Sequence, residues 1–239
     1  MEGRGAQLSE WDAIFPELEG PLGEACYNLQ EFSKKFSVLP KPCQIFRIFE
    51  MIRPSKVRVV FIGQSPYPGV CPATGIPYAC GPAFLPDNRC QTTPVTLHQI
   101  GRELCRDMHI LRLPMPLPSM LLSWIDQGVM LLNACLTIGV GPACPRYLED
   151  HSVLWEAIMH KIIHRLSNDL SNDPVFVLIG HSAWKFEKDI SSNCTVLKTS
   201  HPAARGATSL PFVGSGVFSA VSIALESTGL TPISWLGGV

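Results

Sequence analysis

Residues 57–69 read VRVVFIGQSPYPG and hold the clearest structural signal in the chain. The first seven are mostly β-branched or aromatic, which is typical of a buried strand, and they run directly into a polar loop. Gly63 permits a tight exit from the strand, and Pro66 and Pro68 restrict the backbone on either side of Tyr67. This pattern predicts a central strand whose carboxyl end carries a preorganised ligand-binding loop.

Three further apolar stretches predict strands: VMLLNACL at 129–136, VFVLIG at 175–180 and TVLKT at 195–199. Helical patterns alternate with the strands, and right-handed crossovers in such an order produce a parallel sheet that is covered on both faces. We therefore expect an α/β fold, a three-layer α/β/α sandwich with a four-stranded central parallel sheet. Helices are expected at 27–36, 43–51, 120–127, 152–166 and 216–227, with another that begins at Thr96 as its N-cap.

The length of 239 residues and the apolar content of 46% suit one domain with a large core. Residues 1–22 are acidic and interrupted by Gly and Pro, so we predict a flexible N-terminal segment there and a single domain over 23–239. The stretch 69–93 is rich in Gly, Pro and Cys. It is too long for an idle connection, which indicates a functional loop.

The net charge of −1 and the pI near 6.6 exclude a global attraction to nucleic acid, so any DNA contact must be local. Nine cysteines without a C-x-x-C pair, and the absence of a recognisable secretory leader, predict free thiols in a reducing compartment, the nucleus or cytoplasm. A cluster site at Cys71, Cys80 and Cys90 is the alternative, but the paired ligand spacing is missing. We expect no metal or other cofactor and, without a long apolar run, no membrane partner.

Polar residues follow the predicted strands, where parallel strands end at one edge of a sheet. An asparagine inside an apolar strand costs a few kcal/mol unless its amide is paired, and an amide can pair with both a carbonyl and an N–H of a planar heterocycle. Asn133 therefore either reads the edge of a base or bonds to neighbouring backbone. His201 is either catalytic or a packed loop histidine. The candidate site set is Gln64, Ser65, Tyr67, Tyr78, Asn133 and His201.

Over residues 50 to 235 the chain resembles the uracil-DNA glycosylases. GQSPY at 63–67 is similar to the family motif G-Q-D-P-Y, LLNA at 131–134 to its L-L-N-A, and HPA at 201–203 to its H-P-S or H-P-A loop. The poxvirus members resemble it most. With them it shares P-Y-P around Tyr67, a G-x-P-aromatic motif at 75–78, HPAAR at 201–205 and PISW at 232–235.

The resemblance implies a metal-free enzyme of base excision repair that flips uracil out of single- or double-stranded DNA and hydrolyses its N-glycosidic bond. Asn133 would read the Watson–Crick edge, Tyr78 would stack on the base, and Tyr67 would refuse the methyl group of thymine. Gln64 would bond the O2 or N3 region of the base. His201, acting as a neutral ring, would donate to O2 as negative charge gathers on the leaving uracil.

The resemblance also implies the DNA contacts. Thr96 and Ser182 would meet phosphate through hydroxyls and helix N-termini, and Arg205 stands where most relatives have a leucine that fills the vacated stack. Ala203 and Gly206 replace serines that grip phosphate in relatives, so a weaker grip on DNA is expected.

The main departure from the family is Ser65, which stands at the position of a catalytic aspartate. That aspartate orients the attacking water and stabilises the positively charged sugar, so its loss is expected to cost roughly 3 to 5 kcal/mol. The acidic residues nearest in sequence that could compensate are Asp87, Asp126 and Asp150.

Two other functions remain open at this point. The protein could be a weakly catalytic glycosylase-fold subunit that binds a viral replication or processivity protein, as poxvirus relatives do. It could instead act on other bases, with better leaving groups, because the site lacks the anion.

Overall fold

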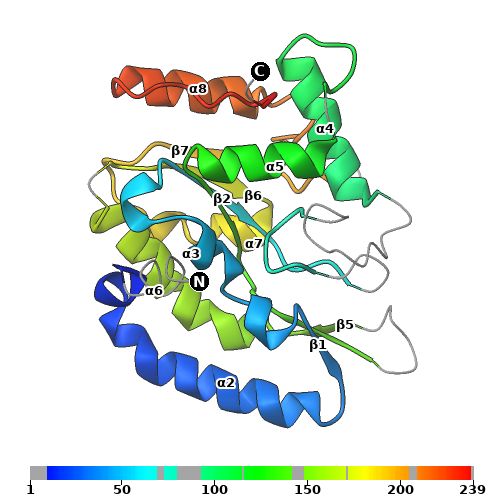
Figure 1. Cartoon of the computed structure of the whole chain (residues 1–239), viewed down its shortest axis with the longest axis vertical. Coiled ribbons are helices and arrows are strands. Elements are labelled where there is room, and N and C mark those ends of the chain that lie inside the picture. The colour runs from blue at the N-terminus through cyan, green and yellow to red at the C-terminus, as the bar shows by residue number, and fades with distance from the viewer. Residues whose placement is uncertain are drawn as a thin grey trace.

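Four parallel strands form the central sheet, in the order β3 (Val129–Asn133), β2 (Val59–Gly63), β6 (Val175–Ile179) and β7 (Val196–Thr199). From β2 the chain crosses to β3 on one side and then to β6 on the other. Figure 1 shows helices α4, α5 and α8 on one face of this sheet and α2 and α6 on the other. The predicted three-layer sandwich with four parallel strands is confirmed.

The computed structural model describes residues 10–68, 73–79, 93–114, 116–141, 148–170, 172–204 and 209–237. The helices among them run over Glu19–Ser33 (α2), Arg47–Met51 (α3), Val95–Asp107 (α4), Leu117–Asp126 (α5), Ser152–Asn168 (α6), His181–Trp184 (α7) and Val217–Ser227 (α8). Short 3₁₀ turns cover Pro16–Leu18 (η1), Pro42–Gln44 (η2), Pro54–Lys56 (η3) and Glu187–Asp189 (η4).

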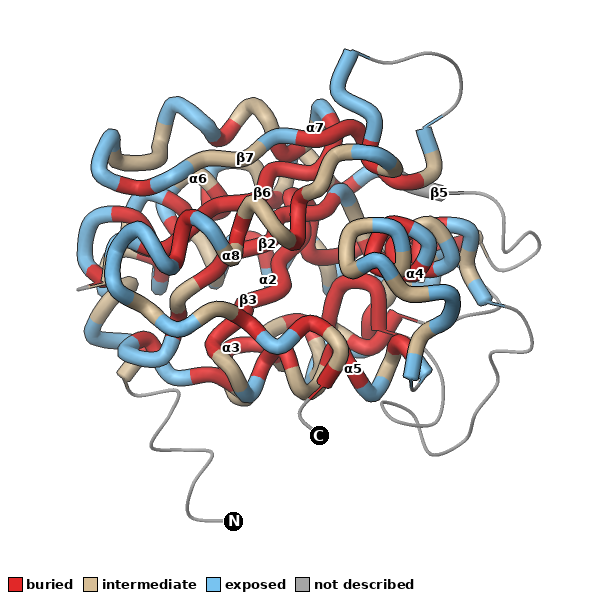
Figure 2. The backbone as a smooth tube through the Cα atoms, turned by 90° about the horizontal axis from the view of Figure 1, so that it is seen from above, coloured by how far each residue is buried: buried red, intermediate tan, exposed pale blue. Residues whose placement is uncertain are grey.

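Strands β2, β3 and β6 are buried at every position, as the tube in Figure 2 shows, whereas β7 is buried only at Thr199. Phe61 on β2 contacts Phe218 of α8 and Trp235, with ring centroids 6.4 and 6.1 Å apart. The indole N–H of Trp124 donates to the Trp235 carbonyl at 2.8 Å. The segment after α8 is thereby held against the core, and these tryptophans serve packing.

A small antiparallel sheet was not predicted. It has the order β1 (Ser37–Leu39), β4 (Ile138–Val140) and β5 (Leu148–Asp150), and β1 pairs with β4 across about a hundred residues of chain. Strands of three residues are too short for an alternating pattern to be recognised.

The N-terminal segment differs from the flexible segment predicted over 1–22. Residues 1–9 lie outside the described part, but Trp11 is only 3% exposed and donates its indole N–H to the Ile52 carbonyl at 3.0 Å. Trp11 also stacks on Phe15 and meets the edge of Phe49. Helix α2 begins at Glu19, eight residues before the predicted start. Aromatic packing orders residues that composition alone assigns to a flexible segment.

Several predicted boundaries are also wrong. Strand β3 ends at Asn133 rather than at 136, and the helix predicted over 43–51 is divided into η2 and α3. Helix α4 begins at Val95 with Pro94 as its N-cap, so Thr96 lies inside the helix and does not cap it. Proline supplies a fixed φ at such a start, where its missing N–H costs nothing.

The Glu103 side chain on α4 is completely buried, and its carboxylate accepts hydrogen bonds from the backbone N–H groups of Gly214 (2.6 Å) and Gly216 (2.7 Å). We expect Glu103→Ala to lower the free energy of unfolding by about 3 kcal/mol, because these buried donors lose their acceptor. Urea denaturation measures this. The control is Glu31→Ala, which removes an exposed partner of Lys34 and should cost less than about 1 kcal/mol. Equal effects of the two changes would contradict the prediction.

Candidate active site

A cavity of about 220 Å³ opens where β2, β3 and β7 end. Strand β3 ends in a predicted site residue, β2 and β7 are followed by one, and α4 and the segment 73–79 complete the wall. The predicted residues that line the cavity together are Gln64, Ser65, Tyr67, Tyr78, Thr96, Asn133 and His201.

Backbone pairing aligns the two strand ends that carry the amide side chains. Gly63 is the register partner of Asn133, and the ladder continues beyond the strands as Ala134 N–H donates to the Gly63 carbonyl (2.9 Å) and Cys135 N–H to the Gln64 carbonyl (3.0 Å). Asn133 is 7% exposed and lines the cavity. The amide therefore lies where a ligand in the cavity can reach it, and the choice between base recognition and a bond to neighbouring backbone stays a prediction.

Gly63 is required by close approach. A Cβ on this residue would lie 2.6 Å from the Tyr78 hydroxyl oxygen and 2.7 Å from Asn133 Oδ1. Both polar groups thus lie against the bare Cα of Gly63 at the floor of the cavity. The prediction was that Gly63 permits a tight exit of the chain from the strand. The structure shows that its missing side chain makes room for two site residues.

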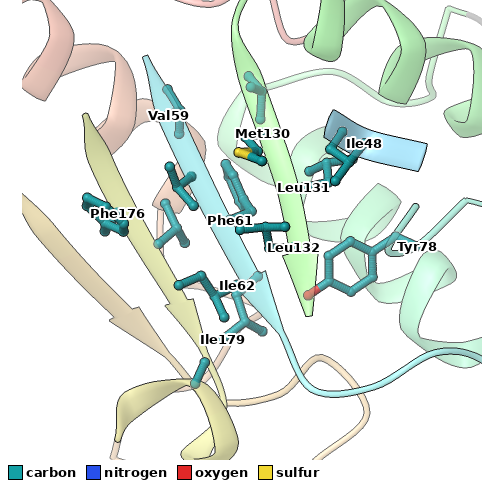
Figure 3. Close-up of a cluster of buried hydrophobic side chains, with 14 of the residues drawn as sticks. Ile48, Val59, Phe61, Ile62, Tyr78, Met130, Leu131, Leu132, Phe176 and Ile179 are labelled. Carbon is teal, nitrogen blue, oxygen red and sulfur yellow. The ribbon is translucent and has the colours of Figure 1, made fainter. Parts of the chain in front are cut away.

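Tyr78 reaches this floor from a constrained segment. Its φ is +64°, in the left-handed region that residues with a side chain rarely adopt. Gly75 before it, also at positive φ, packs so closely on the Gln44 carbonyl that a Cβ could not fit, and Arg47 Nη1 donates to the Thr74 carbonyl at 3.4 Å. Figure 3 shows the Tyr78 ring directed toward the end of β3. Burial raises the pKa of Tyr78, so the hydroxyl keeps its proton.

His201 follows β7, and its surroundings define which ring nitrogen carries the proton. The backbone N–H of Ala203 donates to His201 Nδ1 at 3.1 Å, so Nδ1 acts as an acceptor and the proton of the neutral ring is on Nε2. Burial lowers the pKa of His201 below 6.5 and thereby favours the neutral ring. The turn at Gly180, with φ +83°, packs against the His201 backbone and Cβ. The site therefore holds a neutral imidazole with a donor N–H.

Residues 49–213 match the family model described as the Uracil DNA glycosylase superfamily. The chain belongs to this family. A uracil-DNA glycosylase of Limosilactobacillus reuteri is 32% identical over 227 residues, which cover 94% of this chain and 92% of the bacterial protein. One of Bacillus pumilus is 31% identical over 229 residues, covering 95% and 94%.

Solved structures share the fold of this glycosylase-family chain. The crystal structure of mimivirus uracil-DNA glycosylase has a TM-score of 0.78 and 24% identity, covering 95% of this chain and 86% of that one. A variant of the same mimivirus protein was solved in complex with UGI. These comparisons do not test the likeness to poxvirus members, which stays a prediction.

The family's aspartate has no replacement among the described residues. No described residue that lines the cavity carries a carboxylate. Asp150 instead accepts the Ser152 backbone N–H at 2.8 Å at the start of α6, and Asp126 ends α5, just before the amino end of β3. Compensation by these two residues is therefore wrong, and Asp87 lies outside the described residues.

The predicted DNA contacts are only partly at the cavity. Thr96 lines it, whereas Ser182 on α7 and Ala203 are not among the lining residues. Arg205 and Gly206 lie outside the described residues.

The cavity also has apolar walls that the sequence analysis did not predict. The apolar residues that line it are Ile45, Ile48, Ile76, Leu131, Leu132 and Leu136. No sequence signal pointed to them, because such residues look like ordinary core positions.

The described part of the glycosylase-family chain contains no group of three or more His, Cys, Asp or Glu side chains that could hold a metal ion. The predicted alternative at Cys71, Cys80 and Cys90 lies outside the described residues. No helix within the described ranges is long and apolar enough to cross a bilayer.

Replacing Gly63 with alanine is expected to lower the free energy of unfolding by about 1 to 3 kcal/mol, because the new methyl group collides with Tyr78 and Asn133. The matched control is Gly20→Ala on α2, where nothing lies within 4 Å of the added methyl group. That change should stabilise by up to about 1 kcal/mol through helix propensity. Urea denaturation of both variants measures whether the free energy of unfolding falls or rises. A Gly63→Ala protein as stable as the parent would contradict the prediction.

Proposed function

We propose that this protein is a uracil-DNA glycosylase that turns deoxyuridine out of DNA and hydrolyses the N-glycosidic bond. The observation that carries the proposal is the cavity itself, which gathers an amide, two phenols and a neutral imidazole at one sheet edge. Its volume of about 220 Å³ is below the roughly 300–1,000 Å³ of common small-molecule sites, which suits a single planar ring. Relatives named uracil-DNA glycosylase support the same reading.

Recognition of the base is assigned to residues that line the cavity. The Asn133 amide would accept from N3–H of uracil and donate to O4. Tyr78 would stack on the base, and Tyr67 would exclude a substituent at the 5-position and so reject thymine. Gln64 would hold the O2 or N3 region.

The reaction breaks the bond between C1′ of the sugar and N1 of the base. The bonding electron pair leaves with uracil, whose O2 accepts a hydrogen bond from His201 Nε2–H as negative charge develops. The positively charged sugar is then attacked by water, which adds its oxygen to C1′ and releases a proton. A neutral histidine suits this role because Nδ1 is already occupied by the Ala203 N–H.

Ser65 is proposed to make this glycosylase slow. Its hydroxyl can hold the attacking water but supplies no negative charge to the sugar cation, and no described lining residue supplies one instead. DNA contacts are assigned to Thr96, Ser182, Ala203 and Arg205. The role as a replication or processivity subunit, a viral partner and residence in the nucleus or cytoplasm stay predictions.

The test is release of free uracil from single- and double-stranded DNA that contains one deoxyuridine. We expect slow release by the wild type and none from the thymidine-containing strand of the same sequence. Asn133→Ala is the matched variant, expected to lose uracil release while remaining folded by circular dichroism. If neither the wild type nor Ser65→Asp releases uracil, the proposed function is wrong.

A further inference from the structure

We propose that the Tyr78 hydroxyl determines base specificity: it donates to Oδ1 of Asn133 when a base fills the cavity, and it thereby holds the amide in the orientation that matches uracil rather than cytosine. The inference rests on the proposed function and assigns a separate task to the hydroxyl. Stacking on a base requires only the aromatic ring.

The first observation is an unexplained polar atom. Tyr78 is 7% exposed, and its hydroxyl oxygen is buried without a hydrogen-bond partner in the described chain. Buried hydroxyls are normally paired, because an unpaired one keeps the full cost of leaving water. A phenylalanine would pack in the same place without this cost. The hydroxyl is therefore expected to find its partner when the site is occupied.

The second observation is its position beside the amide. The Tyr78 hydroxyl oxygen and Asn133 Oδ1 lie within 2.6 and 2.7 Å of the same point, the place of the absent Cβ on Gly63. Figure 3 shows the hydroxyl at the carboxyl end of β3, where Asn133 is the last residue. Both groups belong to one corner of the cavity, so a small rotation of either side chain joins them. A carbonyl oxygen has two lone pairs and can accept from Tyr78 and from a base at once.

The direction of this bond decides which base fits. With Oδ1 held by the hydroxyl, the amide presents an acceptor to N3–H and a donor to O4, which complements uracil. Cytosine has an acceptor at N3 and an amino group at C4, so it requires the reversed amide. Reversal would place NH₂ against the phenol oxygen, which is a better donor than acceptor. Burial keeps the phenol protonated, which maintains the donor.

The backbone supports a positioning role. Tyr78 holds a left-handed φ of +64° in a segment fixed by the contact of Gly75 with Gln44 and by the hydrogen bond from Arg47 to Thr74. Unfavourable backbone conformations of this kind persist where surrounding structure enforces them, often at functional sites. The ring is therefore restrained so that its hydroxyl stays beside Asn133.

The experiment compares the full-length wild type with Tyr78→Phe, using free uracil and free cytosine as probes in equilibrium binding. We expect the affinity for uracil to fall about tenfold, the affinity for cytosine to change less, and the preference for uracil to shrink accordingly. The free energy of unfolding should stay the same or rise, because the change removes an unpaired buried hydroxyl. The control is Tyr27→Phe, at a tyrosine that is 63% exposed on α2. It should change neither the preference for uracil nor the free energy of unfolding.

An unchanged uracil-to-cytosine preference in Tyr78→Phe would overturn the inference, whether stability falls or not. A fall in stability with unchanged preference would identify the hydroxyl as a structural group. These outcomes leave the proposed function intact as long as the wild type binds and releases uracil. A wild type that binds neither base and releases no uracil would overturn both.

Discussion

Ser65→Asp is expected to raise the rate of uracil release by a factor that lies between a few hundred and several thousand, which corresponds to roughly 3 to 5 kcal/mol. A carboxylate at this position would place a fixed negative charge near the sugar cation and accept a hydrogen bond from the attacking water. Ser65 lines the cavity and is half-buried, so an aspartate there should ionise at neutral pH. Single-turnover release of uracil from labelled DNA measures the effect on chemistry alone.

The control for this change is Ser65→Asn. Asparagine has the shape of aspartate and can bind the water, but it carries no charge, so its rate should stay within about tenfold of the wild type. A similar gain in both variants would assign the effect to water binding. No gain in Ser65→Asp would mean that the site does not need an anion and would contradict the electrostatic account.

His201→Ala is expected to lower the rate of uracil release by about 10² to 10³-fold, the usual effect of removing one donor from an oxyanion site. The Nε2–H bond to O2 matters most once charge has moved onto the base, so the rate of bond cleavage should fall more than the affinity for uracil. Single-turnover rates and equilibrium binding of uracil separate the two. His201→Asn keeps a neutral donor and should retain more of the rate than the alanine variant.

The pH profile of the wild type gives an independent check on His201. Because burial lowers the pKa of His201 from its usual 6.5, the ring should stay neutral to a lower pH than an exposed histidine does. Protonation at lower pH would put a proton on Nδ1, where it opposes the Ala203 N–H. The rate should therefore be flat at neutral and higher pH and decline as the pH falls through the lowered pKa of His201. A rate that rises as the pH falls would show that the charged ring is the active form.

Much of the fold could be predicted from local pattern. Buried parallel strands have long apolar runs, so 57–63, 129–136, 175–180 and 195–199 stood out, and their alternation with helices led to the correct sheet. The small sheet was missed because its strands have three residues each. The N-terminal packing was missed because it depends on Trp11 meeting Ile52 and Phe49, residues distant in sequence.

The sequence by itself determined which polar groups the strand ends bring to the site, since the ends of parallel strands must share an edge of the sheet. It also determined that the family's carboxylate is a serine. Only the tertiary structure decided how these groups are disposed: the hydroxyl of Tyr78 beside Asn133 over Gly63, the tautomer of His201 set by Ala203, and the absence of a described carboxylate in the wall. Such properties depend on distances and burial between segments far apart in the chain, which no local pattern encodes.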